Sequence, residues 1–396
     1  MLPHESACPG SNGALGSRTG LMLNNPAVVG DAPSYAPGQD AKTQRLHTVH
    51  TLRGLAALGV VWYHFAYLSR LKPWLGLTGK HGNLGVPVFF VISGVILPYS
   101  LWKGRYRLSD FGRFVAKRVI RLDPPYLVAI LLAVMIGYAT GTSSYPGGGP
   151  FAVTPMQLLL HLGFLNVFAG QPWVIGVFWT LAIEFHFYLT LGLTYYLLAS
   201  EREWKFLLFV AGCAVSQYLA LNIRYLPYHW PLFLLGIAAF RHKAGYMTTR
   251  KALLYLLVLF WYCEVTLGLS TAIAGGGAAL CIMFLSLQSQ ITTFLGDISY
   301  SLYLIHQPIG SWICNLGARL VTTPLQAALV AAFATVVVIA AAYLMYRWIE
   351  LPSQRFAGRI RYRAEAGASS KLPQREDRCT HAREPDAGYP VPEALN

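Results

Sequence analysis

Two ionisable residues frame the apolar stretch "TLRGLAALGVVWYHF" at residues 51–65, which begins near Arg53 and ends near His64. Eleven residues of helix return to nearly the same face, roughly 16 Å further along the axis. Ionisable groups deep in a membrane helix usually mark a reaction site or a substrate path, and imidazole is a suitable general base. His64 is therefore a candidate base. The alternative is a snorkelling Arg53 and a His64 that only hydrogen-bonds a neighbouring helix.

A carboxylate is expected at a similar depth. Glu184 lies within "FWTLAIEFHFYL", and helix rise places both Glu184 and His64 roughly 10–12 Å below the outer surface of the hydrocarbon core. A carboxylate beside an imidazole orients a general base. We therefore predict that Glu184 meets His64, with a structural ion pair as the alternative. His186 lies on nearly the opposite face and is expected to be structural.

Further polar residues interrupt two other apolar segments. The segment "LGDISYSLYLIHQPIG" places His306 near mid-membrane, with Tyr303 below it. A hydrogen bond between helices is an equally good explanation of His306. In "GNLGVPVFFVISGVILPYS", Ser93 and Gly94 permit close backbone approach or a local break. Ser93, Tyr303 and His306 are candidate substrate-binding residues.

Basic residues recur with helical spacing in "SDFGRFVAKRVIRLDPPYL". Arg113, Lys117 and Arg121 are four apart, and Arg118 lies beside them. This predicts a basic amphipathic helix on the cytoplasmic surface, stopped at Pro124–Pro125. It could bind anionic lipid head groups. Alternatively, Arg118 and Arg121 form a clamp for a phosphorylated ligand.

Composition indicates the solvent in which these groups lie. The 396 residues are 55% hydrophobic and only 12% charged, against about 25% charged residues in soluble domains. The chain is therefore expected to be a polytopic membrane protein. Its net charge of +14 is carried by short loops and the C-terminal tail, which favours anionic lipid over nucleic acid as the partner. The six cysteines show no CxxC spacing, so neither a disulfide framework nor a metal site is expected.

Recurring apolar segments predict an all-α protein with about ten transmembrane helices. Basic residues concentrate in alternate loops, which predicts that both termini are cytoplasmic. The segments cover residues 51–70, 83–102, 122–140, 177–199, 205–222, 227–241, 251–267, 271–289, 297–316 and 325–348.

The expected organisation is a membrane domain between two tails. Residues 1–45 are rich in Gly, Ala, Ser and Pro and are expected to form a disordered cytoplasmic tail. Residues 46–350 form the membrane domain, and residues 351–396 form a polar, basic cytoplasmic tail. Between the third and fourth spans, residues 156–168 predict an interfacial or re-entrant helix on the outer side.

These motifs together resemble acyltransferase family 3, a group of integral-membrane proteins that transfer acyl groups, often acetyl, to surface glycans. The resemblance covers about residues 50–350 and is carried, in order, by "TLRGLAALGVVWYH", "LGVPVFFVISG", "RVIRLDPPYL", "FWTLAIEFHFYL" and "LGDISYSLYLIHQPI". It implies that Arg53 and His64 are catalytic and that Arg118 and Arg121 handle acyl-CoA.

Two positions depart from the family pattern. Members often carry an aspartate where Pro87 stands and a second glutamate where Phe185 stands. The first departure puts the catalytic share of the second span in doubt, and the second leaves Glu184 as the only carboxylate of its motif. We expect no soluble esterase-like domain of the kind that is fused to some relatives.

We therefore expect a multi-pass acyltransferase of the cell membrane, as in a bacterial inner membrane. It would move acetyl or another acyl group from acyl-CoA, with acetyl-CoA as co-substrate, to a hydroxyl of a glycan or glycolipid acceptor. His64 would be the base, oriented by Glu184, and no metal or permanently bound cofactor is implied. Small residues of the first two spans would leave room for the pantetheine arm, namely Gly54, Gly59, Ser93 and Gly94.

Two other functions remain open at this point. Intramembrane ionisable residues also mark proton-coupled transporters, although paired broken helices in internal repeats are not visible here. A glycan-assembly partner without activity is a third possibility.

Overall fold

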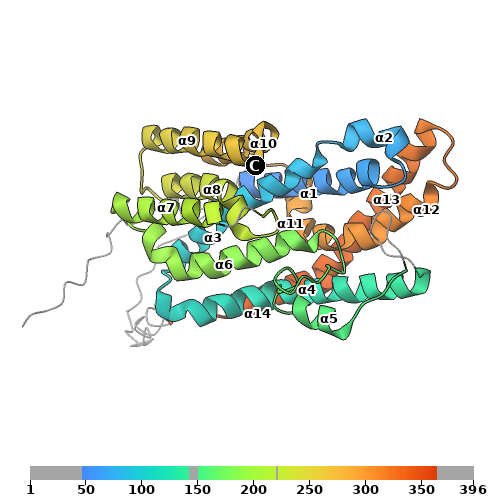
Figure 1. The fold of residues 1–396 in the computed structure, drawn as a ribbon, viewed down its shortest axis with the longest axis horizontal. Helices are drawn as coiled ribbons and strands as arrows, with labels where there is room; N and C mark the ends of the chain where they lie inside the picture. Colours follow the sequence, from blue (N-terminus) through green and yellow to red (C-terminus); the bar gives the residue numbers. More distant parts are fainter. Residues whose placement is uncertain (1–46, 142–149, 220–221, 364–396) are drawn as a thin grey trace, which may run out of the picture. The chain divides into compact units, whose positions relative to one another are not determined.

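The computed structural model describes residues 47–141, 150–219 and 222–363, and all of the elements in these residues are helices (Figure 1). Residues 1–45, predicted to be a disordered tail, lie outside the described residues. The main helices are α1 His47–Trp62, α2 Lys72–Gly79, α3 Gly85–Lys103, α4 Phe111–Thr140, α5 Pro155–His161, α6 Phe178–Leu198, α7 Glu203–Leu219, α8 Trp230–Lys243, α9 Thr249–Leu267, α10 Leu269–Phe284, α11 Gln290–Ile305, α12 Trp312–Gly317, α13 Pro324–Met345 and α14 Leu351–Gly358.

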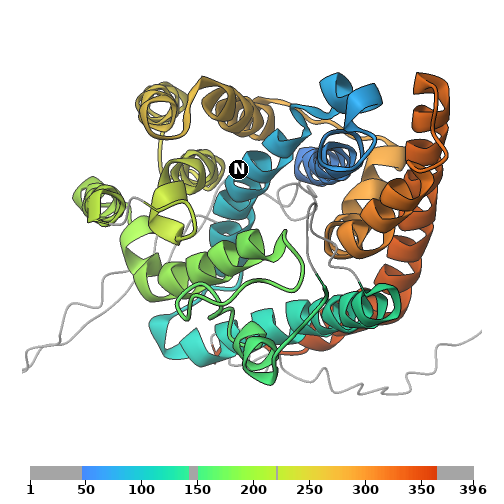
Figure 2. The same cartoon turned by 45° about the vertical axis from the view of Figure 1, so that its right-hand side comes forward.

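Each of the apolar segments predicted from the sequence falls on a helix. Four helical stretches are long and apolar enough to cross a membrane, namely Gly82–Lys103, Leu108–Thr140, Phe178–Leu198 and Pro324–Gly358. The all-helical prediction is therefore confirmed for the described residues, and the number of spans and their orientation stay predictions. Figures 1 and 2 show α9 and α10 (gold) on one side of α8 and α3, with α6 and α4 on the other.

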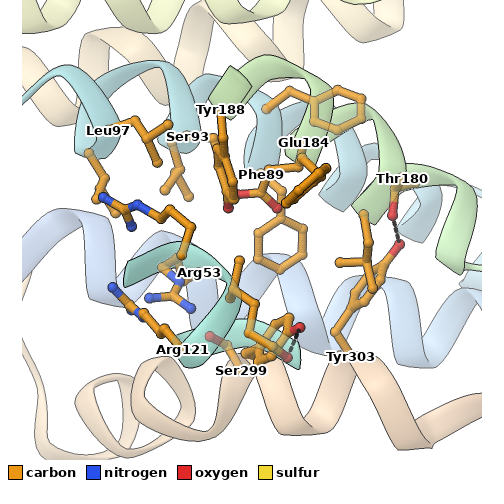
Figure 3. Close-up of a pocket in the computed structure, with 18 of the residues that line it drawn as sticks. Arg53, Phe89, Ser93, Leu97, Arg121, Thr180, Glu184, Tyr188, Ser299 and Tyr303 are labelled. Carbon is orange, nitrogen blue, oxygen red and sulfur yellow. Dashed lines mark hydrogen bonds between the residues drawn. The ribbon is translucent and has the colours of Figure 1, made fainter. Parts of the chain in front are cut away.

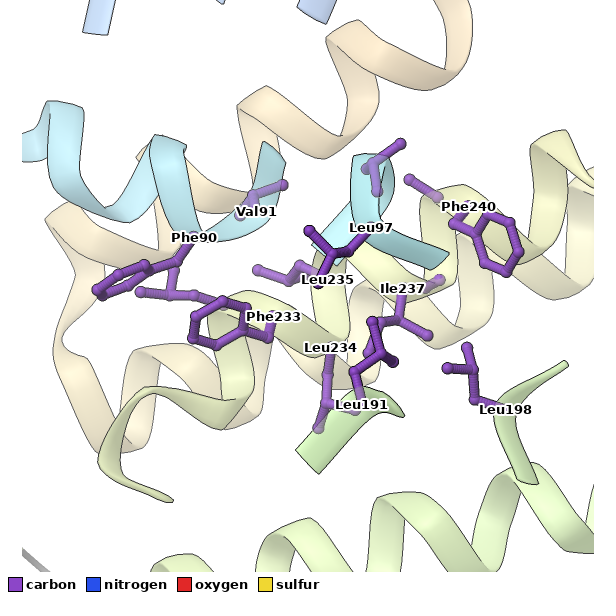
Figure 4. Close-up of a cluster of buried hydrophobic side chains, with 14 of the residues drawn as sticks. Phe90, Val91, Leu97, Leu191, Leu198, Phe233, Leu234, Leu235, Ile237 and Phe240 are labelled. Carbon is purple, nitrogen blue, oxygen red and sulfur yellow. The ribbon is translucent and has the colours of Figure 1, made fainter. Parts of the chain in front are cut away.

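Buried apolar side chains form two clusters. The first joins α3 and α8 to α6, α9 and α10, and Figure 4 shows its centre. There Phe233 stacks on Phe90 and Phe187, with ring centroids 4.9 Å and 4.1 Å apart. The second joins α1, α11 and α13 to α4 and the start of α6. Val86 on α3 and Phe185 on α6 pack against both clusters, so the two clusters meet between these helices.

Glycines bring α1 and α11 into close contact. A Cβ atom added at Gly54 would lie 2.8 Å from the Cβ of Leu295, and one added at Gly296 would lie 2.5 Å from the carbonyl oxygen of His50. Gly94 packs in the same way against the backbone of α8. Gly54 and Gly94 therefore serve helix packing, which corrects the expectation that they leave room for a ligand.

Helix α4 differs from the predicted surface helix that stops at Pro124–Pro125. It is continuous from Phe111 to Thr140, with both prolines inside it. A proline inside a helix removes an N–H donor, but in membrane helices neighbouring groups compensate. Next to the prolines, the hydroxyl of Tyr300 on α11 donates to the carbonyl of Leu122, at 3.0 Å, and so ties this part of α4 to α11. The basic residues therefore begin a long apolar helix and do not form a separate element.

The beginning of the predicted C-terminal tail is also helical. A π-helical segment, η7 (Tyr346–Glu350), leads from α13 into α14, which lies along α4 (Figure 1). Beyond α14, the backbone N–H of Arg363 donates to Asp110 at 3.2 Å, and Lys117 donates to the carbonyl of Ile360 at 3.4 Å. The chain therefore packs against α4 as far as residue 363.

A short helix follows α4 in the chain, as predicted for residues 156–168. Helix α5 begins at Pro155, where the Thr154 hydroxyl caps it by accepting from the Gln157 N–H at 3.1 Å. His161 at its end is fully buried; its Nδ1 lies 2.7 Å from the Gln157 carbonyl, and its Nε2 accepts from the Val174 N–H at 3.2 Å. These bonds hold the segment that leads to α6.

Candidate active site

A cavity opens where the two apolar clusters meet, between α1, α3, α4, α6 and α11 (Figure 3). The space in it for water-sized molecules measures about 100 Å³. Its apolar wall includes Val86, Phe89, Phe90, Ile92, Ile96, Leu97, Leu122, Phe164, Leu181 and Phe185. Its polar lining comprises Arg53, Ser93, Arg118, Arg121, Thr180, Glu184, Tyr188, Ser299, Tyr300, Tyr303 and Glu350.

Three guanidinium groups line this cavity. Arg118 is only 6% exposed; it donates to the Ser100 hydroxyl at 3.2 Å, and its buried Nε has no partner among the described residues. Arg53 and Arg121 also reach the cavity, and neither forms a hydrogen bond or ion pair with another described residue. Burying a cation without a full set of acceptors is costly. The three arginines therefore form a site with unused capacity for an anion.

Two carboxylates lie in the same cavity. One oxygen of Glu184, Oε1, accepts from the Ser93 hydroxyl at 2.6 Å and from the Tyr188 hydroxyl at 2.5 Å. Glu350 is 2% exposed, and its Oε2 accepts from the backbone N–H and the hydroxyl of Ser301, at 3.2 Å and 2.6 Å. Both carboxylates line the cavity together with Arg53. Both therefore offset part of the positive charge of the cavity.

His64 and His306 form a pair beside the cavity. Their rings lie 4.8 Å apart, and Nε2 of His306 is 3.3 Å from Nδ1 of His64. Each Nδ1 also faces a backbone carbonyl, that of Val60 for His64 at 2.9 Å and that of Tyr303 for His306 at 2.7 Å. A carbonyl can only accept, so we assign the proton of each neutral ring to Nδ1. The lone pair of His64 is then on Nε2.

Tyr303 connects this pair to the cavity. Its hydroxyl lies 2.6 Å from the Thr180 hydroxyl, which also donates to the Val177 carbonyl. Both side chains line the cavity (Figure 3), and the Tyr303 carbonyl is the one that holds His306. The polar side chains of the site thus form a row, in which the arginines come first, followed by Glu184, Tyr303 and the histidine pair.

Three π-helical segments supply ionisable residues of the site. His64 is the second residue of η2 (Tyr63–Leu68), His306 is the first residue of η6 (His306–Ser311), and Glu350 is the last residue of η7. A π-helical turn inserts an extra residue into an α-helix and is frequent at functional sites. Short π-helical turns were not expected from the sequence.

The structure brings together most of the residues singled out in the sequence. Of these, Arg53, Ser93, Arg118, Arg121, Glu184 and Tyr303 line one cavity, and His64 pairs with His306.

One expected contact differs. No hydrogen bond joins Glu184 to His64 in the described part of the chain, because Glu184 bonds Ser93 and Tyr188 and His64 bonds Val60 and His306. Equal depth in the membrane does not place two side chains on facing surfaces.

Sequence reasoning missed Glu350, Tyr188 and Thr180. The sequence analysis places Glu350 at the end of the membrane domain, two residues beyond the last apolar segment, and the carboxylate directly after "YRWI" was a usable signal. Tyr188 and Thr180 lie one turn on either side of Glu184 on α6. The helical spacing around Glu184 would have pointed to both.

The comparisons with known proteins agree on a family of acyltransferases. A family model described as an acyltransferase domain matches residues 46–347. ORF330 of Acidianus two-tailed virus, named as a candidate acetyltransferase, is 29% identical over 287 residues, which cover 64% of this chain and 80% of the relative. Acyltransferase MdmB of Streptomyces mycarofaciens is 31% identical over 38% of this chain and 39% of its own length. O-acetyltransferase OatA of Staphylococcus aureus is 28% identical over 40% of this chain and 24% of its own length. No solved structure matches the chain.

Proposed function

The chain belongs to acyltransferase family 3, and from this membership we propose that it transfers an acyl group, most simply acetyl, from acyl-CoA to a hydroxyl of a cell-surface glycan or glycolipid. The names of the relatives support acetyl as the group. Its place would be a bacterial inner membrane, which it would span several times. The observation that carries the proposal is an arginine-lined cavity beside a histidine pair.

The arginine end of the cavity suits the phosphates of the donor. Guanidinium groups bind phosphate through paired, charge-assisted hydrogen bonds. Arg118 has an unpartnered Nε, and Arg53 and Arg121 have no described hydrogen-bond partner. A phosphate of acyl-CoA would supply the missing acceptors. In this proposal the charged nucleotide stays at the mouth of the cavity while the pantetheine arm enters.

The histidine end suits proton transfer. A sugar hydroxyl is a weak nucleophile at neutral pH and needs a base. Nε2 of His64 would take the hydroxyl proton while the oxygen attacks the thioester carbonyl. As the carbon–sulfur bond breaks, the thiolate would take that proton from the imidazolium, which yields an ester and free CoA thiol. His306 Nε2 would accept the remaining Nδ1–H and stabilise the imidazolium.

The two ends imply a route across the membrane. The basic residues of the loops predict cytoplasmic termini, which would place the arginines towards the cytoplasm and His64 towards the outer side. Acyl-CoA would enter from the cytoplasm, and the acceptor hydroxyl would reach His64 from outside.

The direct test is donor consumption. Purified protein in lipid vesicles, given acetyl-CoA and a glycan or lipid extract of the host, is expected to release CoA thiol and to acetylate a component of the extract. Comparing the glycans and lipids of a deletion strain with its parent would identify the acceptor. Absence of both thiol release and acetylated product would contradict the proposal.

A further inference from the structure

One oxygen of Glu184 is left without a described partner. Oε1 accepts from both Ser93 and Tyr188, whereas no described group donates to Oε2. Glu184 lines the cavity beside Tyr188 (Figure 3). A carboxylate can only accept hydrogen bonds, so a ligand that satisfies Oε2 must present an N–H or O–H group at this level of the cavity.

The helical rise along α6 gives the distance of Glu184 from the arginine end and from the histidine end of the site. Tyr188, Glu184 and Thr180 are four residues apart, so successive members lie about 6 Å apart along the axis. The Arg118 guanidinium lies 5.6 Å from the Tyr188 ring centre, and Thr180 bonds Tyr303.

His306 lies further in the same direction. It is the first residue of η6 and follows Tyr303 by three helical residues, or about 4.5 Å. From the level of Arg118, Glu184 is thus about 6 Å away, and His306 about 16 Å.

In acyl-CoA, the co-substrate of the proposed function, the phosphate, the inner amide and the thioester are spaced to match these distances. In its pantetheine arm, six bonds separate the nearest phosphorus atom from the inner amide nitrogen, and thirteen separate it from the sulfur. An extended chain advances about 1.2 Å per bond, which gives about 7 Å to the inner amide and about 16 Å to the sulfur. With phosphate at Arg118, the inner amide comes to the level of Glu184 and the thioester comes to the level of the histidine pair.

We infer that Glu184 is a donor-recognition residue whose Oε2 accepts a hydrogen bond from the inner amide N–H of the pantetheine arm. This inference rests on the proposed function and deepens it. It separates Glu184 from the proton transfer at His64, to which no described hydrogen bond connects it. Ser93 and Tyr188 then hold the carboxylate in place from α3 and α6.

Three acetyl donors, truncated step by step from the phosphate end, test this inference. Acetyl-CoA carries phosphates and both amides, S-acetylpantetheine keeps both amides without phosphates, and S-acetyl-N-acetylcysteamine keeps only the outer amide. We expect Glu184→Ala to lower kcat/KM about ten-fold or more with the first two donors, because a charge-assisted bond is lost. With the shortest donor the loss should stay below about three-fold, since that donor has no inner amide for a bond of this strength. Where turnover of the shortest donor is too slow, its inhibition constant against acetyl-CoA replaces kcat/KM.

Matched variants locate the effect. The double variant Arg118→Ala with Arg121→Ala should lower kcat/KM for acetyl-CoA alone, because the other two donors lack phosphate. Glu184→Gln keeps an accepting oxygen and should recover part of the loss. Glu264→Gln changes a carboxylate of α9 outside the cavity and should leave all three donors unaffected. Membrane levels and thermal midpoints of each variant exclude simple misfolding.

The outcomes separate the inference from the function beneath it. An equal loss with all three donors in Glu184→Ala would overturn the inference and restore a role at His64. No loss with any donor would overturn it as well. A wild-type protein that consumes none of the three donors would overturn the proposed function and, with it, the assignment of Glu184.

Discussion

At the level of single residues, the proposed chemistry depends on two imidazoles that share a hydrogen bond. The Val60 and Tyr303 carbonyls fix both Nδ1 protons, so His306 can only accept from His64. A base held in one tautomer is ready to take a proton without rearranging. His306 is fully buried, whereas His64 is half-buried and thus the one an acceptor can reach.

His306→Ala is predicted to lower kcat roughly ten- to a hundred-fold, because the imidazolium of His64 loses the acceptor for its Nδ1–H. The KM for acetyl-CoA should change by less than about three-fold. His306→Gln, which keeps an accepting oxygen, should retain more activity than the alanine variant. Steady-state kinetics in vesicles measure all of these, and an unchanged kcat in His306→Ala would contradict the pairing.

Replacing Arg118 and Arg121 together by alanine is predicted to raise the KM for acetyl-CoA about ten-fold or more, with a smaller effect on kcat. Donor binding by the wild type should weaken as salt is added, because part of the attraction to phosphate is screened. The control is Arg319→Ala, which removes an exposed loop arginine outside the cavity. Unchanged donor affinity in the double variant would return Arg118 and Arg121 to a lipid-binding or purely structural role.

At the level of elements, the close packing of α1 on α11 positions both ends of the site. Arg53 and His64 lie on α1 and η2, while Tyr303 and His306 lie on α11 and η6. The glycine contacts at Gly54 set the distance between the two helices. The π-helical turns then direct the two imidazoles towards each other.

The segment from α5 to α6 should make stability depend on pH. Burial lowers the pKa of His161 below its usual 6.5, against the smaller, opposing effect of the Gln157 carbonyl. Below pH 6.5 the unfolded chain therefore binds a proton that the folded chain resists, so this stability is present above that pH and is lost as the pH falls.

Thermal midpoints measured from pH 8 to pH 5 test this dependence. His161→Gln is expected to lower the midpoint at pH 8, through lost buried hydrogen bonds worth about 1–3 kcal/mol. It should also show a weaker decline towards pH 5. Identical pH profiles for both proteins would contradict the role of His161.

The sequence indicated which polar residues come together better than it indicated which of them face each other. The helical spacing of the basic residues pointed to Arg118 and Arg121, and counting along an apolar segment pointed to Glu184. All three line the same cavity. The rotation of a helix about its own axis decides which neighbour Glu184 contacts, and this rotation is set by packing against other helices. For that reason the bonds of Glu184 to Ser93 and Tyr188 were missed. The passage of α4 through Pro124–Pro125 depends on contacts with other helices, which no local propensity contains.

At the level of the whole molecule, the proposed route across the membrane depends on the distance between Arg53 on α1 and His64 on η2, which follows α1 directly. The spacing of Arg53 and His64, eleven residues apart, is roughly 16 Å. In the proposed function, this separation would allow the charged nucleotide to stay at one face while the thioester reacts deeper in the membrane.

Vesicles loaded inside with labelled acetyl-CoA, with the protein inserted cytoplasm-inside, test transfer across the membrane. Label should appear in an acceptor added only outside, since the pantetheine arm, not the nucleotide, crosses towards His64. Vesicles with His64→Ala provide the matched control for leakage. Labelling that occurs only when donor and acceptor share the cytoplasmic side would contradict this route.

The most direct test of the central claim is the acetyl-CoA turnover of His64→Ala beside the wild type in the same vesicles. Without its base, the variant is predicted to lose transfer by at least about a hundred-fold. It should insert at wild-type levels, because removing a polar side chain from lipid does not hinder insertion. Near-normal turnover in His64→Ala would show that the proton leaves the acceptor by another group and would contradict the proposed mechanism.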